Sequence, residues 1–501
     1  MIENRHSSNR NIIRRIIVRG NLFLDTPTSL GSGDAESLVD VPLLRDTISN
    51  HALLTGSSVG GALRNYLREH DQGYYLKENR HDLVSKLFGD LFVYPNEVNI
   101  LNEQEKIKIK SQDNQSLLII DDAVSNSRIQ SELRDGVKIN SITCTAIDKA
   151  KYDFEILQAG TEFPLSFELL IEKESDEPSL LKGLAIALQG LKQGEISLGI
   201  KKHRGFGRCH VKEWQVWQFD LRDASDRIAW LTLDYSWSTD TPCTKLPAVN
   251  ASIVEAMKEA ELEFPEEWED QREFCKIDAT FTLASPLLIR SGQASSDKAP
   301  DVVHLKSRRN GELKPVLSGT SLAGVLRHRA ERIINTIGKN TSIIEDIFGS
   351  DLSKNKTSEA KASRLIVHES VIENTTDLVQ NRIAIDRFTG GTLHGALFNE
   401  QPIFPNSETH LKLNLELRNP EDNEIGLLLL LLKDLWTGDL PVGGTSSIGR
   451  GRLQGKYLTI TLQREQQNTT FTIVQSSENL VVSDAESLEK FVSALNEEVN
   501  K

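Results

Sequence analysis

The sequence predicts an α+β protein made of two tandem domains with a modified ferredoxin-like, or RRM-like, order of elements. Two observations lead to this prediction. The same motifs occur twice in the same order along the 501 residues, and strand patterns are interleaved with helix patterns inside each copy. A chain of this length also exceeds what one hydrophobic core supports, so two domains are the default expectation.

Five pairs of motifs define the internal repeat. The segment TGSSVGGALRNYL around Gly56 matches SGTSLAGVLRHRA around Gly319. The other anchors pair Phe88 with Phe348, Ile120 with Val367, Phe163 with Phe404, and Gly207 with Gly449. Two copies about 250 residues apart indicate a duplicated domain, because the units of a solenoid are only ~20 to 50 residues long.

These anchors divide the chain into four parts. The first repeat covers residues 12–222 and the second covers 274–465. Residues 223–273 form an inter-repeat segment, whose stretch from 255 to 273 holds nine acidic and two basic residues and is interpreted as a linker. Residues 466–501 form a polar C-terminal tail in which SDAESLEKFVSALNEEV is typical of a capped helix.

Each repeat is expected to run through a strand, a long loop, a helix, more strands, a hairpin, a second helix, a glycine-rich loop and a closing strand. In the first repeat RRIIVRGNLFL alternates as a strand, and TGSSVGGALRNYLREH begins a helix with Ser at the cap. SLLIIDDAV is a short buried strand, LLKGLAIALQGLKQG a second helix and CHVKEWQVWQFDL the closing strand. This order fits a ferredoxin-like sandwich with an elaborated first loop.

Composition excludes several classes of protein. Hydrophobic residues make up 38% and charged residues 26%, which argues against disorder. The longest purely apolar stretch, Leu427 to Leu432, is far too short to cross a membrane, and we expect a cytoplasmic protein. The four cysteines are too far apart in sequence for a CxxC site, which favours reduced thiols. The net charge is −14, and half of this excess lies in the acidic run, so the repeats themselves can still bind phosphates locally.

The start of the first helix in each repeat is a candidate phosphate site. The turns are Gly56-Ser57-Ser58 and Gly319-Thr320-Ser321. A helix start offers free backbone N–H groups and a positive dipole end, although an ordinary N-cap has the same composition. An arginine follows each turn, Arg64 and Arg327, and this recurrence favours RNA binding by Ser57, Ser58, Arg64, Thr320, Ser321 and Arg327.

The late glycine-rich loops, residues 200–212 and 442–453, are the second candidate. Glycines let the backbone approach a polyanion while cations supply the charge. The candidate RNA-binding cations are Lys201, Lys202, Arg204 and Arg208 in the first loop and Arg450 and Arg452 in the second. A solvated basic loop is the alternative, and the occurrence of two such loops at one place in the repeat favours nucleic-acid binding.

A glycine-containing hairpin is predicted in each repeat, at residues 134–163 and 382–404. The second hairpin carries two further candidate RNA-binding cations, Arg382 and Arg387, and the apolar residue Phe388 near its tip. A projecting hairpin with apolar residues can splay bases from a stack. A purely structural β-arm would have the same pattern, and the sequence does not separate the two.

The long loop after the first strand of each repeat contains an acid before an apolar residue. These acids are Asp40 and Asp301, with Asp34 and Asp297 as competing candidates. An acid in a Gly/Ser loop is usually a turn residue. Beside a phosphate-binding surface, however, a carboxylate can orient a ribose 2′-hydroxyl or hold a divalent cation.

On these motifs the chain resembles the RAMP superfamily and, within it, the backbone subunit of type III CRISPR effector complexes. The motifs are GSSVGGALR and GTSLAGVLR, the FG of LFGDL and IFGSDL, the hairpin RIAIDRFTGGTLHGALF, and the loops RGFGR and GGTSSIGRGR. The second repeat follows the family pattern more closely, since the first hairpin lacks the IDRFTGG character. Two fused repeats resemble the multi-domain subunits of the type III-D branch.

The resemblance implies two RAMP domains with thumb hairpins, which hold guide CRISPR RNA and distort its duplex with target single-stranded RNA at regular intervals. It implies other CRISPR effector subunits as partners in a hetero-oligomer. It also implies an endoribonuclease in which Asp40 and Asp301, with a transiently bound divalent ion (Mg or Mn) and no fixed metal cage, cut the target by 2′-hydroxyl attack. Sequence specificity would belong to base pairing, with the protein reading backbone and shape.

Two other readings remain open. In the first, both repeats bind guide RNA as a scaffold and neither cuts. In the second, the chain is an endonuclease that matures the guide, which would favour a site centred on histidine. The histidines of the two loops and the hairpin, His203, His210 and His394, form no obvious site in the sequence.

Overall fold

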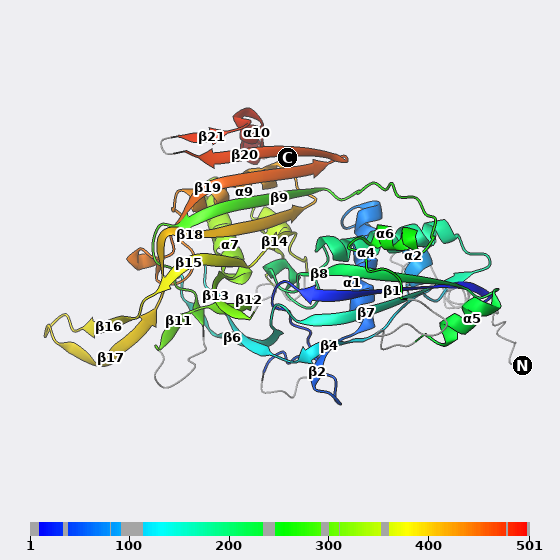
Figure 1. Ribbon diagram of the computed structural model, residues 1–501. Helices are drawn as coiled ribbons and strands as arrows, with labels where there is room; N and C mark the ends of the chain where they lie inside the picture. Colours follow the sequence, from blue (N-terminus) through cyan, green and yellow to red (C-terminus); the bar gives the residue numbers. More distant parts are fainter. Residues whose placement is uncertain are drawn as a thin grey trace, which may run out of the picture.

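The computed structural model shows two α+β units side by side, one from each repeat (Figure 1). The structure describes residues 10–33, 39–80, 82–91, 114–233, 246–291, 300–309, 311–351, 360–476 and 479–497. Among these residues, no helix combines the length and apolar character needed to cross a membrane.

The first repeat is built on a four-stranded antiparallel sheet with the order β3-β7-β1-β8. Its strands are β1 (Ile12–Leu24), β3 (Leu118–Ile120), β7 (Glu162–Glu172) and β8 (Cys209–Asp220). Helices α1 (Gly56–Gln72) and α4 (Glu177–Gln193) contribute to one hydrophobic core with this sheet. The sheet order and the crossover positions of the two helices are those of a ferredoxin-like fold, which confirms the predicted fold class.

The second repeat reproduces this arrangement and extends it on both sides. The central strands are β14 (Leu365–Val367), β18 (Ile403–Arg418), β9 (Phe274–Leu283) and β19 (Leu453–Arg464), with helices α7 (Gly319–Thr336) and α9 (Asp422–Trp436). On one side the sheet gains β12 (Lys306–Arg309), β13 (Glu312–Leu317) and β15 (Ser370–Asp377); on the other it gains β20 (Gln467–Gln475) and β21 (Leu480–Val482). The run of leucines at 427–432 is therefore a buried helix, not a membrane segment.

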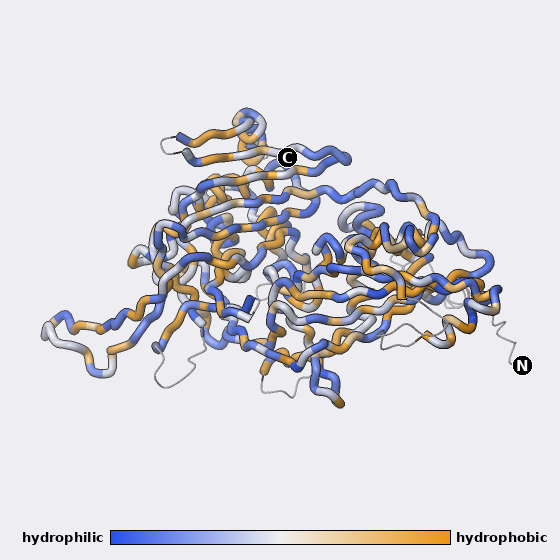
Figure 2. The backbone as a smooth tube through the Cα atoms, viewed as in Figure 1, coloured by the Kyte–Doolittle hydropathy of each residue, from blue (hydrophilic) through white to orange (hydrophobic). Residues whose placement is uncertain are grey.

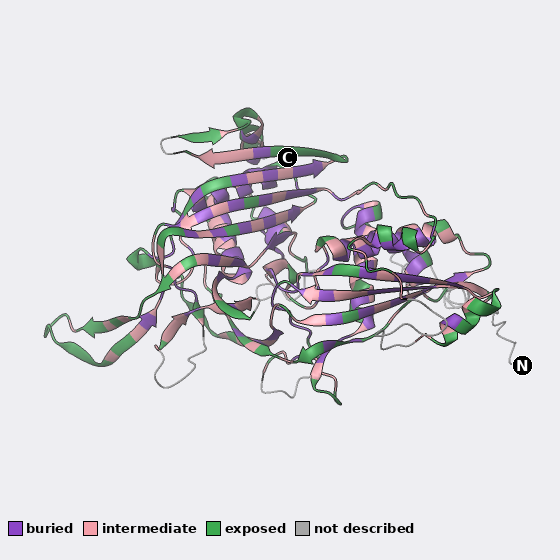
Figure 3. Cartoon of the chain, viewed as in Figure 1, coloured by how far each residue is buried: buried purple, intermediate pink, exposed green. Residues whose placement is uncertain are grey.

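Smaller elements complete each repeat. The first repeat adds β2 (His51–Leu54), α2 (Leu83–Phe88), β4 (Ala123–Arg128), the hairpin β5 (Ser131–Ile139) and β6 (Ala146–Leu157), and the 3-10 turn η1 (Lys202–Arg204). The second adds β10 (Arg290–Ser291), β11 (Val302–His304), α8 (Ser342–Phe348), the hairpin β16 (Gln380–Ile385) and β17 (Thr392–Gln401), and η2 (Ser446–Ile448). Figure 3 shows buried residues along both sheets, whereas β16 and β17 project into solvent.

Part of the segment predicted to be a linker is instead packed on the first repeat. The inter-repeat segment contains α5 (Ala224–Leu231) and α6 (Ile253–Glu259), and α6 overlaps the start of the predicted linker at residue 255. Ile253 and Met257 of α6 are fully buried in the core of the first repeat. The acidic residues of α6 lie on its outer side because its apolar residues recur at helical spacing. Figure 2 shows the hydrophilic chain that then leads from α6 to β9 between the two units.

The predicted C-terminal tail is also part of a domain. The expected helix is present as α10 (Ala485–Glu497), and its Leu488 and Leu495 are buried in the second core. Gly426 of α9 provides the close approach, because a Cβ there would lie 2.1 Å from the carbonyl oxygen of Phe491. The second domain therefore continues well beyond residue 465.

Three of the five repeat anchors are confirmed and two are wrong. Gly56 and Gly319 both begin a helix, Phe88 and Phe348 both end one, and Ile120 and Val367 both end a strand. The structure pairs Gly205 with Gly449 and Gly207 with Gly451, because these glycines hold the same positive φ in the same turn. The structure also makes Leu411, not Phe404, the equivalent of Phe163. Phe163 lies opposite Leu22 in the first sheet, and Leu411 lies opposite Phe281 at the matching position of the second.

The two repeats are joined by a buried ion triad between the first hairpin and the second sheet. Glu369 of the second repeat accepts hydrogen bonds from Arg134 of β5, at 3.0 Å, and from Arg309 of β12. The side chains of Glu369 and Arg134 are 2% and 5% exposed. Burial disfavours the charged carboxylate, but the two arginines outweigh it and hold the pKa of Glu369 below its usual value.

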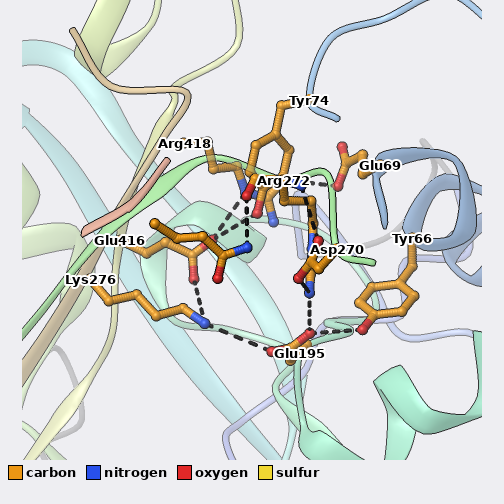
Figure 4. Close-up of polar contacts among 10 residues, drawn as sticks. Tyr66, Glu69, Tyr74, Glu195, Asp270, Arg272, Lys276, Glu416 and Arg418 are labelled. Carbon is orange, nitrogen blue, oxygen red and sulfur yellow. Dashed lines mark hydrogen bonds and ion pairs between the residues drawn. The ribbon is translucent and has the colours of Figure 1, made fainter. Parts of the chain in front are cut away.

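A second polar network also lies at the junction (Figure 4). Arg272, from the chain between α6 and β9, pairs with Glu195 of the first repeat at 2.8 Å and with Asp270 at 2.6 Å. Arg418 of the second repeat lies 3.6 Å from Glu69 of the first. These contacts cross between the repeats and hold them in one orientation.

Replacing Glu369 with alanine is expected to lower the free energy of unfolding by roughly 3–5 kcal/mol, because the buried Arg134 and the half-buried Arg309 lose their counter-charge. Urea denaturation measures the loss. The matched control is Glu373→Ala, since Glu373 pairs with Lys314 at the surface and its removal should cost less than about 1 kcal/mol. Equal, small losses in the two variants would contradict a stabilising role for the triad.

Candidate nucleic-acid interface

The glycine-rich loop of each repeat has the same backbone. Each passes through a left-handed residue, a 3-10 turn and a left-handed glycine, namely Gly205 in the first repeat and Gly449 in the second. The next glycine, Gly207 or Gly451, also has positive φ. A Cβ on Gly451 would lie 1.9 Å from the carbonyl oxygen of Val442, so this position requires glycine for both conformation and space.

The surroundings of the two loops differ. The first loop packs against the second repeat, where a Cβ on Gly205 would lie 2.3 Å from the backbone nitrogen of Glu369. Its four candidate cations, Lys201, Lys202, Arg204 and Arg208, therefore lie at or near the inter-repeat junction. The ammonium of Lys201 sits over the rings of Tyr152 and Phe154, and burial lowers its pKa to about 8.

The second loop is open to solvent, and residues 446–449 are exposed. Its two candidate arginines nevertheless have different environments. Arg450 is buried and donates to Glu400 at 2.9 Å and to Gln380 at 2.6 Å, which ties the loop to the base of the second hairpin. Arg452 is exposed and is the better placed of the two to contact a ligand.

The helix starts are formed differently from the prediction. The N-caps are Thr55 and Ser318, and their side chains accept hydrogen bonds from the backbone N–H groups of Ser58 and Ser321, which lie in the first turn. The predicted serine cap is therefore wrong by position. Ser57 and Ser58 are exposed. Their counterparts Thr320 and Ser321 are half-buried.

The arginine that follows each turn ties the helix to its own repeat. Arg64 pairs with Glu78 and donates to the carbonyl of Phe88 at 3.3 Å. Arg327 pairs with Glu331 and donates to the carbonyl of Gly349 at 2.9 Å. These carbonyls lie at the ends of α2 and α8, so the recurrence of the arginine has a structural explanation.

The two hairpins, called thumbs from here on, have equivalent tips. In the first thumb the side chain of Asn140 accepts from the backbone of Ile142, and in the second Asp386 accepts from Phe388. Ile142 is 91% and Phe388 100% exposed. The first thumb therefore keeps an apolar tip despite its different sequence. Of the two candidate cations of the second thumb, Arg382 pairs with Glu400 at 3.3 Å and Arg387 is exposed at the tip.

The predicted catalytic acids occupy equivalent positions at the bases of the thumbs. One carboxylate oxygen of Asp40 accepts from the backbone N–H of Asp153 in β6, at 2.9 Å. One oxygen of Asp301 accepts from the backbone N–H of Asn399 in β17, at 2.8 Å. Both acids are exposed. The residue that follows each acid, Val41 or Val302, forms a parallel β-bridge with a strand of the thumb. The competing acids Asp34 and Asp297 lie outside the described residues.

Comparison with protein families identifies the family to which these repeats belong. A model of the RAMP superfamily matches residues 23–210 and 280–454, which lie in the first and second repeats and together exceed half of the chain. The chain belongs to the RAMP superfamily. No curated protein matches it.

Sequence reasoning missed the partners of the acids in both RAMP repeats. Asp153 and Asn399 are the same position in the two thumbs, and in the first repeat the carboxylate of Asp153 accepts in turn from the backbone N–H of Asp40, at 3.1 Å. The motif comparison could not find this pair because it aligned the thumbs through Phe163 and Phe404. The matching tips, Asn140 and Asp386, provide the correct alignment.

A cavity of about 510 Å³ lies between the two RAMP repeats and was not predicted. His203 from the first glycine loop and His368 from the second repeat line it. Burial and nearby cations lower the pKa of His203 to about 4 and that of His368 to about 3. Both histidines are therefore neutral at pH 7 and lie at the junction, while His210 pairs with Asp25 and His394 is exposed on the second thumb. The structure thus separates the three histidines considered for guide maturation.

The two junction histidines should make the chain less stable in mild acid. The unfolded chain binds protons at pH about 6.5, whereas the folded chain binds them near pH 4 and below, so lowering the pH through this window favours unfolding. The double variant His203→Gln/His368→Gln should flatten the fall in melting temperature between pH 7 and pH 5. His394→Gln is the exposed control. An unchanged decline in the double variant would contradict the assignment.

Proposed function

We propose that the chain is the guide-RNA-binding backbone subunit of a type III CRISPR effector, of type III-D-like tandem form, and that it cuts bound target RNA once per repeat. The observation that carries the proposal is the equivalent placement of Asp40 and Asp301. Two acids from loops of different sequence and length meet the same strand position of two thumbs. An acid that served only its own turn would have no reason to recur there.

The position of each acid suits cleavage beside a displaced base. Each acid lies at the base of a thumb whose tip exposes an apolar residue, Ile142 or Phe388, able to intercalate in a base stack. Regular duplex geometry holds the 2′-oxygen out of line with the 5′-oxygen that must leave. Displacing a base lets the backbone rotate towards that alignment, which is the main requirement of the reaction.

The chemistry requires ribose. The 2′-oxygen attacks the adjacent phosphorus and forms a new P–O bond while the bond to the 5′-oxygen breaks. The products are a 2′,3′-cyclic phosphate and a 5′-hydroxyl, so the proton lost by the 2′-oxygen is balanced by the one gained by the 5′-oxygen. In this proposal the free oxygen of Asp40 or Asp301 orients the 2′-hydroxyl and accepts its proton. DNA lacks the nucleophile and is not cut.

The residues present fit a transiently held divalent ion. In the described part of the chain, no three Asp, Glu, His or Cys side chains converge as a metal site. Mg²⁺ commonly uses one or two carboxylates together with phosphates and water. Asp40 and Asp153 supply two such carboxylates in the first repeat, and Asp301 supplies one in the second, beside the amide of Asn399. When bound, the ion would neutralise charge that develops on the phosphate.

The guide would be held by exposed groups at the helix starts and loops. In the described chain, the exposed members of the predicted RNA-binding set are Ser57, Ser58, Lys202, Arg387 and Arg452. Lys202 faces the inter-repeat cavity. The others lie on solvent-facing surfaces and can contact the guide backbone, while base pairing selects the target.

Asp40→Asn and Asp301→Asn should each abolish one of two target-RNA cleavage products in the assembled complex. Asparagine keeps an oxygen that accepts the thumb N–H, so these variants remove the charge and retain the anchor. A loss of about 10²-fold or more in the rate of one cut is expected if the carboxylate acts as a general base. Gel analysis of end-labelled target resolves the two products, and binding of target should persist.

The alternative function, a scaffold that holds guide RNA without cutting, is favoured by the same hydrogen bonds, because each carboxylate already anchors a thumb. Asp439→Ala, which removes an exposed acid at the end of α9, is the control for loss of charge alone. Unchanged cleavage in both asparagine variants would leave the acids with only an anchoring role and favour the scaffold.

The two repeats should also differ in their need for divalent ions. The first repeat offers two carboxylates, so its cut should persist at lower Mg²⁺ than the cut of the second. Asp153→Asn should raise the Mg²⁺ concentration for half-maximal cutting by the first repeat, and Asn399→Asp should lower it for the second. The reciprocal variants control for each other, and shifts in the same direction would contradict the assignment.

A further inference from the structure

The cavity between the two repeats holds cations that its own carboxylates do not neutralise. Six lysine and arginine side chains line the cavity, together with four carboxylates. Each carboxylate is already engaged with another residue of the lining; these are Glu69, Glu195, Asp278 and Glu416. Figure 4 shows three of them beside the lysine and arginine side chains with which they pair. The lining as a whole therefore carries excess positive charge.

Two of the lining cations, Lys202 and Arg208, have no carboxylate partner. Both belong to the first glycine loop: Lys202 begins the 3-10 turn η1, and Arg208 directly precedes β8. In the described part of the chain, neither side chain takes part in an ion pair. These two groups are therefore the part of the lining that is free to bind an anion.

His368 brings a polar group from the second repeat to the same cavity. Its Nδ1 is buried and has no hydrogen-bond partner among the described atoms. Burial lowers the pKa of His368 and the charge of Arg208 lowers it further, which indicates that the imidazole and the guanidinium are near each other. A neutral imidazole still donates through one ring N–H, so an anion between the two groups would receive hydrogen bonds from both.

This set of donors suits a phosphate group. The planar fork of a guanidinium binds two phosphate oxygens at once, and an ammonium adds a compact positive charge. The phosphate would in turn supply the counter-charge that Lys202 and Arg208 lack. The cavity therefore offers a phosphate site built by both repeats.

Tyr75 indicates what the rest of the ligand contains. It lines the cavity with 51% of its surface exposed, and its φ of 65° lies in a region that bulky residues rarely occupy. The neighbouring rings of Tyr66 and Tyr74 are each covered by a guanidinium, of Arg272 at 4.8 Å and of Arg418 at 4.9 Å. The ring of Tyr75 is thus available to stack on a planar group, and aromatic side chains beside cations commonly stack on nucleobases.

We propose that the inter-repeat cavity binds a free mononucleotide, with its phosphate on Lys202, Arg208 and His368 and its base on Tyr75. The cavity volume of about 510 Å³ falls within the ~300–1,000 Å³ of small-molecule sites. Because the phosphate site takes groups from both repeats, the ligand would also link them. The site is independent of the proposed RNA cleavage, since neither proposed catalytic acid lines the cavity.

A phosphate of the guide RNA is the other source of the same chemistry. A continuous strand needs an open, positively charged groove that follows its backbone. The exposed candidates Ser57, Arg387 and Arg452 lie on solvent-facing surfaces and suit that task. Lys202 and Arg208 instead line a cavity between the repeats, which favours a single nucleotide over a strand.

Isothermal titration calorimetry of the full-length chain, freed of RNA by nuclease treatment, tests the proposal. The probes are AMP, UMP and ribose 5-phosphate, which present the same phosphate with a purine, a pyrimidine or no base. AMP or UMP should bind saturably with a Kd below about 1 mM, and ribose 5-phosphate should bind more weakly. Failure of both nucleotides to bind, or equal binding of ribose 5-phosphate, would overturn the proposal.

Variants test the two ends of the site separately. Lys202→Gln and Arg208→Gln should each weaken nucleotide binding about 10-fold, because each removes a charge-assisted hydrogen bond. Lys212→Gln is the matched control, since Lys212 is exposed on β8 and does not line the cavity. Tyr75→Gly keeps the backbone conformation and should weaken only the nucleotides, leaving ribose 5-phosphate unchanged. Undiminished nucleotide binding in the first two variants would exclude the site.

The assembled complex loaded with guide RNA distinguishes the two sources of phosphate. A cavity reserved for a free nucleotide should bind AMP or UMP with the same Kd whether or not the guide is present. Loss of nucleotide binding on loading would assign the cavity to the guide and overturn the proposal.

Discussion

The structure depends on the close approach of two backbones that carry no side chains between them. The turn that ends at Gly205 lies against the strand that leads to Glu369, and Gly319 lies against the carbonyl of Arg204. Any larger residue at either glycine would push the repeats apart. Around this contact the buried pair of Arg134 with Glu369 and the network of Arg272 fix the orientation of one repeat on the other.

This contact also explains why a duplicated surface does not perform the same task twice. In the first repeat the glycine loop is an internal joint, and its cations stack on rings or face a cavity between the repeats. In the second repeat the same loop reaches solvent with Ile448 and Arg452. The thumb bases, by contrast, retain equivalent acids, since Asp40 and Asp301 each accept a hydrogen bond from the same strand position of their thumbs.

The sequence predicted the fold class, the duplication and the equivalence of the two acids, since each depends on local patterns that survive in both copies. It did not predict which groups would be engaged within the protein. The sequence suggested that Arg64 and Arg450 were free to bind a ligand. In the structure they are neutralised by Glu78 and Glu400, which come from other segments of the chain and could not be assigned as partners from local patterns. The acidic run was interpreted as a linker because its charged residues outnumber the few buried residues, such as Met257 and Leu262, that attach it to the first core.

The rigid joint has a geometric consequence for any ligand that spans the chain. Helix α6 is part of the first core, and Arg272, just before β9, pairs with Glu195 of the first repeat. The chain between α6 and β9 is therefore tied to the first repeat near both ends and cannot lengthen freely. The two thumbs are therefore held at one fixed distance from each other. A nucleic-acid strand that contacts both thumbs would meet them at a spacing set by the joint between the repeats, whatever the sequence of that strand.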